Sequence, residues 1–472
     1  MGKAGQIVAF DHQPAAVPKR VRRALGSCGV EVRLGDEVGL LDGPAPRTLI
    51  RSPGVRLDAP LVREARRRGA EVIDELELGW RLARAPLVGI TGTNGKTTTS
   101  ALASSLLEAA GLCAPLAGNA DVAPPLSAIR GQPDAIVCEV SSFQLEACPT
   151  FVPEVGVFTN LSPDHLARHG DIDRYAAVKR SLFVKGRSVV PLAVVDTIDQ
   201  PGARLADEVE RAGARVVRLG RGGSVPYRLL DARWDLHGGQ FALRTPTGTL
   251  ELRTNLPGVY NARNAALVVA LADSLELPRT LTVATLARHP GVEGRFEHIG
   301  RIGAGAWGAR LILDSAATPA AAGEFLAAVR AGIAPGARLH AVVGLLGVSE
   351  PAQRRALGRM VASLCDRVVV TSGSYRSKPP AATMEEILVG ARGVEATEVI
   401  RVPRRELAIA VAAAGASRRD VVCVIGRGNL VEVIDSSRVD DRGVMRRLVD
   451  GAAPSRSGPK RLSPTSSREL SV

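Results

Sequence analysis

The chain has 472 residues, 45% of them hydrophobic and 23% charged, which is typical of a soluble globular protein too long for a single core. It contains no run of about 18 apolar residues and no hydrophobic N-terminal segment before a small-residue cleavage site, so we expect a cytoplasmic protein without membrane association. The net charge of +13 favours anionic ligands, but the basic residues are diffuse and only eight Phe, three Trp and four Tyr residues could stack on bases, which disfavours nucleic acid.

The cysteine pattern indicates neither disulfides nor a zinc site. The cysteines show no CxxC or other metal-ligand spacing, and several lie inside apolar segments. We therefore expect reduced thiols in the cytoplasm and no zinc. The six positions are Cys28, Cys113, Cys138, Cys148, Cys365 and Cys423.

Residues 1–85 are expected to form a small Rossmann-like domain, because short apolar runs alternate with helical stretches. Ser52 opens the turn Ser52-Pro53-Gly54-Val55 after one of these runs, and the free backbone donors of such a turn could meet a diphosphate. An ordinary turn explains the same residues equally well. The predicted strands are Ile7–Phe10, Val30–Val32, Thr48–Ile50 and Val72–Ile73, and the predicted helices include Lys19–Leu25 and Pro60–Arg68.

The stretch Leu87–Ser100, LVGITGTNGKTTTS, predicts a strand, a glycine-rich turn and a helix that together bind phosphate. Backbone N–H groups and the positive end of the helix can face phosphate oxygens, while Lys96 reaches the β/γ-phosphates and the Thr97 hydroxyl binds Mg²⁺. The strict phosphate-loop spacing is missed by one position, since Ile90 stands where the first glycine belongs, and a turn without a ligand is the alternative. The predicted ATP-binding residues of the loop are Gly92, Thr93, Asn94, Gly95, Lys96, Thr97 and Thr98.

Residues 86–290 are expected to form a central ATP-binding domain with a parallel sheet, as in P-loop ATPases. Glu139 ends the predicted strand Ala135–Val140, and His165 follows the predicted strand Val155–Thr159. Ligands of open parallel sheets lie at the carboxyl ends of strands, so both residues are expected beside the phosphate loop as a Mg²⁺ site. Further on we predict a helix Arg174–Val184 containing Lys179, antiparallel strands within 227–254, and a helix Tyr260–Asp273 that opens with Asn261 and Asn264.

Residues 291–450 are expected to form a C-terminal domain with a doubly wound α/β sheet, because strand-like and helix-like segments alternate. The tail 451–472 is rich in Ser, Pro and Arg, which predicts disorder. The predicted strands are Leu311–Asp314, His340–Leu345, Arg367–Thr371, Glu398–Val402 and Val421–Ile425, and the helices include Ala320–Arg330, Ala352–Leu364 and Arg405–Ala414.

Seven short blocks follow one another along nearly the whole chain: GTNGKT at 92–97, EVSSFQLE at 139–146, NLSPDH at 160–165, YAAVKRSLF at 175–183, GVYNARNAA at 258–266, GRFE at 294–297 and DSAATP at 314–319. Together they resemble the Mur ligases, ATP-dependent enzymes that build the peptide stem of peptidoglycan on UDP-N-acetylmuramic acid. The SPGV at 52–55, the ELEL at 75–78 and SSFQLE resemble the glutamate-adding members. The resemblance implies UDP-MurNAc-L-alanine and glutamate as substrates of an enzyme expected to be monomeric.

The resemblance also implies a role for each candidate residue. Lys96, Lys179 and His165 are the implied catalytic residues, and Thr97, Glu139, His165 and Lys179 would hold two Mg²⁺ ions. Lys179 matches a lysine that family members carbamylate with CO₂, and only seven of the 61 basic residues here are lysine. An arginine could not readily form that adduct. The remaining implied contacts are adenine at Asn261 and Asn264, the γ-phosphate at Arg295, ribose at Asp314, uridine diphosphate at Ser52, and the muramyl side at Asn119 and Gln144.

The C-terminal blocks depart from the glutamate-adding pattern. Ala316 and Pro319 stand where a lysine and an asparagine are typical, so DSAATP partly resembles the member that adds diaminopimelate or lysine. TSGSYRSKPP at 371–380 and IGRGN at 425–429 resemble that member too, but lack the Asp-Asn-Pro before Arg376 and the His-Glu after Gly428. Arg376 and Ser315 are therefore our candidates for binding the incoming amino acid, Arg376 by its bidentate guanidinium.

We expect a ligase that joins glutamate, D-glutamate favoured, to UDP-MurNAc-L-alanine through an acyl phosphate. The same reaction with L-glutamate, or a Mur-type ligase for another amino acid, is the closest alternative. A folylpolyglutamate or cyanophycin-type ligase would share the nucleotide blocks but not the first domain. A non-catalytic homologue is a further alternative, because the third domain is altered.

Overall fold

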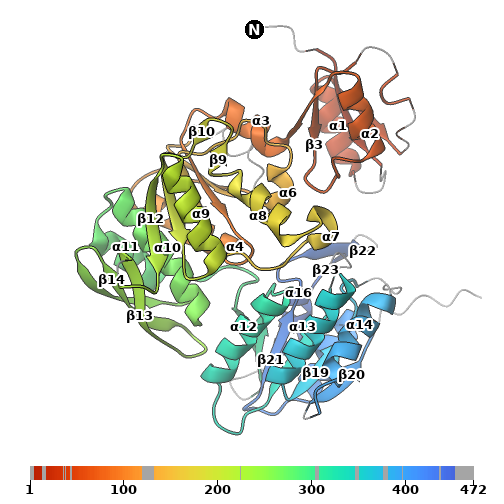
Figure 1. Ribbon diagram of the computed structural model, residues 1–472. Coiled ribbons are helices and arrows are strands. Elements are labelled where there is room, and N and C mark those ends of the chain that lie inside the picture. The colour runs from red at the N-terminus through yellow and green to blue at the C-terminus, as the bar shows by residue number, and fades with distance from the viewer. Residues whose placement is uncertain are drawn as a thin grey trace, which may run out of the picture.

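The computed structural model has an α/β fold, as expected, in which three groups of strands follow one another along the chain (Figure 1). It describes residues 5–12, 17–35, 37, 39–42, 45–119, 132–223, 225–302, 308–345, 350–375, 381–395, 397–434 and 437–451. Arg376 and all of the predicted tail except Gly451 lie outside these residues. The division into domains at residues 85, 290 and 450 remains our proposal.

The N-terminal part consists of two strand–helix–strand units with parallel pairing. Strand β1 (Ile7–Asp11) pairs with β2 (Val30–Leu34) across α1 (Lys19–Ser27), and β3 (Thr48–Arg51) pairs with β4 (Glu71–Asp74) across α2 (Pro60–Arg67). Within the described residues these are two separate pairs, not one continuous sheet. Helix α3 (Glu75–Leu82) begins directly after β4, because the Asp74 side chain accepts a hydrogen bond from the Leu76 N–H at 3.1 Å and so caps it.

The central part is a nine-stranded sheet in the order β15-β14-β13-β12-β11-β8-β5-β7-β6. Pairing is parallel from β6 to β13 and antiparallel for the last two strands. Because β5 lies between β7 and β8, the loop after β5 is flanked by the residues that follow β7 and β8. The strands are β5 (Leu87–Thr91), β6 (Leu116–Gly118), β7 (Ile136–Glu139), β8 (Val155–Phe158), β11 (Leu192–Asp196), β12 (Arg215–Gly220), β13 (Tyr227–Trp234), β14 (Gly239–Thr245) and β15 (Gly248–Thr254).

Helices cover both faces of this sheet, so its parallel strands are buried on both sides. Val88 and Ile90 of β5 pack towards one set of helices, while Leu87 packs towards the other. The first set is α4 (Lys96–Ala109), α10 (Val259–Ser274) and α11 (Arg279–Arg288); the second is α3, α6 (Ser142–Leu145), α8 (Ile172–Arg180) and α9 (Gln200–Arg211), with α7 (Leu166–His169) before α8.

The C-terminal part is a six-stranded sheet in the order β16-β17-β21-β18-β19-β20, parallel except for β16. Its strands are β16 (Glu297–Arg301), β17 (Arg310–Leu313), β18 (Leu339–Val343), β19 (Arg367–Val370), β20 (Glu398–Arg401) and β21 (Val421–Ile425). One face carries α12 (Pro319–Gly332), α13 (Pro351–Leu364) and α14 (Ala381–Arg392), the other α15 (Arg405–Ala414) and α16 (Asp441–Val449), and the hairpin β22 (Val431–Ile434) and β23 (Ser437–Asp440) follows β21.

The helix that carries Lys179 differs from its predicted bounds of Arg174–Val184. Helix α8 starts earlier, at Ile172, because the Asp171 side chain accepts a hydrogen bond from the Arg174 N–H at 2.8 Å. It ends at Arg180, and the following residues form the short antiparallel pair β9 (Val184–Lys185) and β10 (Ser188–Val189).

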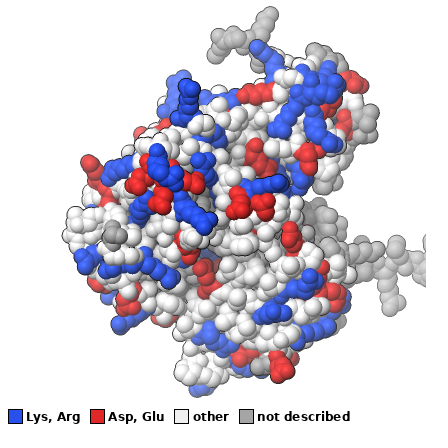
Figure 2. All heavy atoms as spheres, viewed as in Figure 1, with Lys and Arg blue, Asp and Glu red and all other residues white. Residues whose placement is uncertain are grey.

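Charge is distributed unevenly over the face shown in Figure 2. Basic and acidic side chains intermingle over the central and C-terminal parts, whereas basic side chains predominate over the N-terminal part (Figure 2). Helix α1 contributes to this excess with the sequence KRVRRALGS. Within the described parts of the chain, none of the helices combines the length and apolar character needed to span a bilayer.

Candidate active site

The loop between β5 and α4 requires glycine at two positions. Gly92 has φ +151°, and a Cβ there would lie 1.9 Å from Oγ1 of Thr159. Gly95 has φ +84°, and its Cβ would lie 2.4 Å from Oδ1 of Asn264. Larger residues rarely adopt these conformations and would also collide here. The loop is therefore held between the segment after β8 and helix α10.

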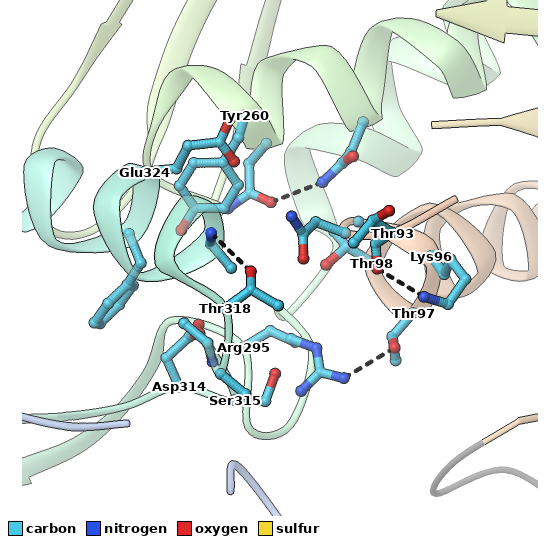
Figure 3. Close-up of a pocket in the computed structure, with 18 of the residues that line it drawn as sticks. Thr93, Lys96, Thr97, Thr98, Tyr260, Arg295, Asp314, Ser315, Thr318 and Glu324 are labelled. Carbon is cyan, nitrogen blue, oxygen red and sulfur yellow. Dashed lines mark hydrogen bonds between the residues drawn. The ribbon is translucent and has the colours of Figure 1, made fainter. Parts of the chain in front are cut away.

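A cavity of about 230 Å³ lies over the start of α4, between the central and C-terminal sheets (Figure 3). Sequence-predicted residues from both halves line it, so the structure brings together segments some two hundred residues apart in the sequence. They are Thr93, Asn94, Gly95, Lys96, Thr97, Thr98, Asn119, Glu139, Asn261, Asn264, Arg295, Asp314 and Ser315.

Lys96 is the first residue of α4, and its ammonium lies against the loop. It donates hydrogen bonds to the carbonyl oxygens of Gly92 at 3.1 Å and Thr93 at 2.8 Å. Burial lowers the pKa of Lys96, while the carboxylates of Glu139 and Asp164 oppose that shift. Phosphate oxygens in the cavity could replace these carbonyls as acceptors for the ammonium.

Arg295 crosses the cavity from the C-terminal half. Its guanidinium donates a hydrogen bond to Oγ1 of Thr97 at 3.0 Å (Figure 3). The next residue, Phe296, has φ +44°, and its N–H donates to Oδ2 of Asp314 at 2.7 Å. Asp314 also accepts from the Ala316 N–H at 2.7 Å. The buried Asp314 carboxylate thus fixes the backbone that aims Arg295 at the phosphate loop.

Glu139 has the features of a cation ligand. It is 2% exposed, and Oε1 accepts a hydrogen bond from the Asn119 side chain at 2.9 Å. Its Oε2 is buried and has no hydrogen-bond partner among the described residues. A carboxylate oxygen left unpaired in the cavity that the Thr97 hydroxyl also lines is the kind of oxygen donor that Mg²⁺ prefers, so these residues fit the ion.

Lys179 lies immediately behind the loop. It is 1% exposed, donates a 2.6 Å hydrogen bond to the Gly92 carbonyl, and lies over the Tyr175 ring with its nitrogen 4.6 Å from the centroid. Burial lowers the pKa of Lys179 well below its ordinary value, and the charge of Lys96 adds to the effect. The side chain is therefore biased towards the neutral amine, which is the nucleophilic form.

His165 is not among the residues that line the cavity, whereas its neighbour Asp164 is. His165 has φ +52°, and its Nε2 lies 3.3 Å from Oδ2 of Asp164, while its ring centroid lies 4.7 Å from that of Phe143. Burial lowers the pKa of His165. Across the described residues, no group of three or more His, Cys, Asp and Glu side chains is arranged to hold a metal ion.

Asn261 and Asn264 lie on the first turns of α10, both nearly fully buried. The Asn264 amide donates to Oδ1 of Asn261 at 3.2 Å, and Asn261 donates to the Pro257 carbonyl at 2.8 Å. These bonds fix both amides at the cavity wall, where Tyr260 and Glu324 also lie (Figure 3). Tyr260 and Glu324 were not predicted, because neither belongs to a short nucleotide motif.

Two predicted substrate residues lie away from the cavity lining. Gln144 is the third residue of a capping box at α6: its Oε1 accepts from the Ser141 N–H at 2.9 Å, and its own N–H donates to Oγ of Ser141. Ser52 is exposed in the turn after β3, where Val55 donates to its carbonyl at 3.0 Å. The roles proposed for both residues stay predictions.

Comparison with known families gives two matches. A model described as "Mur ligase middle domain" matches residues 90–272, and one described as "Mur ligase, glutamate ligase domain" matches residues 294–428. The UDP-N-acetylmuramoylalanine–D-glutamate ligase of a Synechocystis species is 33% identical over 319 residues, which are 66% of this chain and 68% of that protein. The enzyme of that name from Pelotomaculum thermopropionicum is 35% identical over 324 residues, 67% of this chain and 68% of the relative.

Solved structures resemble the fold at lower identity. The UDP-N-acetylmuramate–alanine ligase of Thermotoga maritima superposes with a TM-score of 0.62 at 20% identity, covering 89% of this chain and 90% of that one. The folylpolyglutamate synthase of Mycobacterium tuberculosis, solved with ADP and AMPPCP, gives a TM-score of 0.59 at 20% identity, covering 74% and 90%. At these identities the likeness concerns the fold alone.

Proposed function

Since the chain belongs to the Mur ligase family and is an ATP-dependent amide ligase that forms ADP, we propose that it adds glutamate, D-glutamate favoured, to UDP-N-acetylmuramoyl-L-alanine. The observation that carries this proposal is the cavity in which Lys96 and Thr97 of the phosphate loop meet Arg295 and Asp314 of the other half. The named relatives support the choice of glutamate.

In the proposed reaction, the carboxylate of UDP-MurNAc-L-alanine attacks the γ-phosphorus of ATP and ADP leaves. The amino group of the incoming acid then attacks the acyl phosphate, loses a proton and expels inorganic phosphate as the amide forms. Lys96 and Arg295, which come from different halves of the protein, offset the charge on the transferring phosphoryl group. The protein contributes chiefly positioning and electrostatic stabilisation.

Thr97 and Glu139 are the proposed direct ligands of Mg²⁺, with Lys179 and His165 behind them. Bound Mg²⁺ would neutralise phosphate charge and orient the γ-phosphoryl group. The Thr97 hydroxyl accepts a hydrogen bond from Arg295, so cation binding at Thr97 would free Arg295 to meet the γ-phosphate. The low pKa of Lys179 supports its proposed carbamylation, because CO₂ reacts with the neutral amine.

For the amino-acid site the key residue is Arg376, which we propose from the sequence alone because it lies outside the described residues. Ser315 lines the cavity, and Ala316 is buried where a lysine is typical of glutamate-adding enzymes. Arg427 was missed by the sequence reasoning: it is 2% exposed after β21, and its guanidinium donates to the Gly373 carbonyl. This contact holds the loop that leads into Arg376.

Single-turnover ADP release with UDP-MurNAc-L-alanine and D-glutamate, L-glutamate, L-lysine or meso-diaminopimelate tests the proposal. We expect release with a glutamate enantiomer, faster with the D form. Preference for either diamino acid would overturn the glutamate assignment, and folate-dependent release would favour the folylpolyglutamate alternative. Arg376→Ala should raise the KM for the amino acid, with the KM for ATP as the internal control.

A further inference from the structure

We propose that Arg168 is a positioning residue that holds the turn 52–55 in the conformation that receives the diphosphate of the nucleotide-sugar substrate. This inference rests on the proposed function. It predicts that the loss of Arg168 weakens binding of a uridine diphosphate and leaves the ATP site unchanged.

The guanidinium of Arg168 donates hydrogen bonds to three carbonyl oxygens of the turn. It donates to Pro53 at 2.9 Å, to Gly54 at 3.2 Å and to Val55 at 3.3 Å, more than a hundred residues away in sequence. Three successive carbonyls directed at one cation cannot also face the ligand side of the turn. The peptide groups are thereby oriented by one side chain of the central part.

A second buried arginine holds the same turn. Arg51, at the end of β3, is 2% exposed and donates to the carbonyls of Val55 at 2.6 Å and Pro53 at 3.1 Å. It also donates to the Phe143 carbonyl at the start of α6. Two guanidinium groups therefore lie beneath the turn and polarise its peptide groups, while Glu146, which pairs with both, offsets part of their charge.

The ligand side of the turn keeps free hydrogen-bond donors. Ser52 and Gly54 are exposed, and within the described residues neither the Gly54 N–H nor the Ser52 hydroxyl has a hydrogen-bond partner. A Cβ at Gly54 would meet nothing within 4 Å, so the turn is open to a ligand. Unpaired donors on a turn whose carbonyl oxygens are all held on the opposite side have the chemistry of a phosphate-binding turn.

Arg168 itself is held in place by Glu146 and Phe143, which belong to the segment after β7. It forms a bidentate pair with Glu146 at 2.8 and 2.6 Å, and its guanidinium lies 4.1 Å from the centroid of the Phe143 ring. The same ring contacts His165, three residues before Arg168. Arg168 thus ties the turn of the N-terminal part to helix α7 beside the phosphate cavity. Lysine could supply the charge but not this set of five hydrogen bonds.

Calorimetric binding of UDP and of ADP to the full-length protein separates this role from a general structural one. Arg168→Gln and Arg168→Lys should each weaken UDP binding at least about tenfold and change ADP binding less than about twofold, with the lysine variant only partly restored. The matched control is Arg174→Gln, because Arg174 lies six residues further along the chain, its side chain is 75% exposed, and among the described residues its ion pair is with Asp171. It should bind both nucleotides as the wild type does.

UDP affinity within twofold of the wild type in either folded variant would overturn the inference, as would a parallel loss of UDP and ADP affinity. Hydrogen exchange of the wild type covers the case in which the variants do not fold. UDP should protect the amides of Ser52 and of residues 54–56, and binding without that protection would also overturn it. If the wild type binds ADP but no UDP, the proposed function falls, and this inference falls with it.

Discussion

Lys96 and Lys179 both donate to the carbonyl of Gly92, so two amino groups share one acceptor behind the phosphate loop. Each charge disfavours the other, and the more deeply buried Lys179 is the one whose pKa falls furthest. A phosphate in the cavity would draw Lys96 away from Gly92. We therefore expect different chemical roles for the two lysines, although they lie side by side.

Replacing Lys179 with alanine should nearly abolish activity, and added acetate or formate should partly restore it, because the function is assigned to an anionic carbamate. Turnover against carboxylate concentration measures the recovery. Lys185→Ala is the control, since Lys185 also lies in the central part and donates to a backbone carbonyl, that of Cys148, away from the cavity. If mass spectrometry shows an unmodified Lys179 in a fully active enzyme, the assignment is contradicted.

The buried carboxyl group of Asp74 should make the free energy of unfolding depend on pH. Burial raises its pKa from 3.8 to about 7, and Arg51 at 3.8 Å does not offset the burial. A raised folded-state pKa means that stability is lost as pH rises from about 4 through 7, by on the order of 4 kcal/mol. Asp74→Asn keeps the cap on α3 but cannot ionise, so its Tm relative to the wild type should rise between pH 5 and pH 8.

The control for that measurement is Asp171→Asn, which alters another helix cap whose side chain is 54% exposed. Its Tm difference from the wild type should stay constant over the same pH range. A constant difference for Asp74→Asn as well would show that Asp74 is ionised throughout.

Much of the phosphate end of the site was predictable from single residues, because loop glycines, Lys96 and the strand-end Glu139 obey local rules. Asp164, which lines the cavity, was not predicted beside His165, because adjacent residues cannot be told apart by strand position alone. His165 has a left-handed backbone conformation, and its role in the site stays a prediction. The contacts of Gln144 depend on a helix cap, and those of Arg168 on an N-terminal turn more than a hundred residues away.

At the scale of elements, the start of α4 depends on α10, because Asn264 packs against Gly95. Gly95→Ala should therefore weaken ATP binding about tenfold or more, since the new methyl group adds a collision to backbone strain. Gly111→Ala is a matched control: its φ is +87° against +84° for Gly95, and a Cβ there would meet nothing within 4 Å. Nucleotide affinity and Tm of both variants separate strain from collision, and equal ATP affinities would contradict the packing argument.

The strands named from the sequence in the two large sheets agree with the structure within one or two residues, since continuous apolar runs admit few alternatives. Strands β6, β11 and β12 of the central sheet were not among them. The antiparallel strands within 227–254 were also confirmed. The predicted end of α8 was wrong, because a hairpin whose strands have only two residues each leaves almost no periodic signal. Strand order was beyond the sequence as well: nothing local indicates that β5 lies between β7 and β8, although that order creates the site.

For the whole molecule, the hydrogen bond from Arg295 to Thr97 joins the C-terminal half to the phosphate loop. The cavity of about 230 Å³ is smaller than the ~300–1,000 Å³ typical of small-molecule sites, so we expect the halves to separate when ATP enters. Arg295→Ala should lower kcat at least about a hundredfold. It should also shift the solution radius of gyration, measured by X-ray scattering with ADP and Mg²⁺, towards the more open state.

Arg301→Ala is the control, because Arg301 lies in the adjoining strand β16 and donates to carbonyls of its own half, those of Gly308 and Arg418. It should leave both kcat and the scattering curve unchanged. A compact Arg295→Ala protein with normal turnover would show that the contact between Arg295 and Thr97 does not hold the two halves together.

The order of the C-terminal sheet has a consequence for biosynthesis. Strand β21, near the end of the chain, pairs with β17 on one side and β18 on the other, so the sheet has a gap in its middle until residues 421–425 have been synthesised. Until then the emerging polypeptide exposes the inner edges of β17 and β18, which are open to pairing with other chains. The nascent enzyme is thus most vulnerable to aggregation late in translation, when its nucleotide loop is already complete.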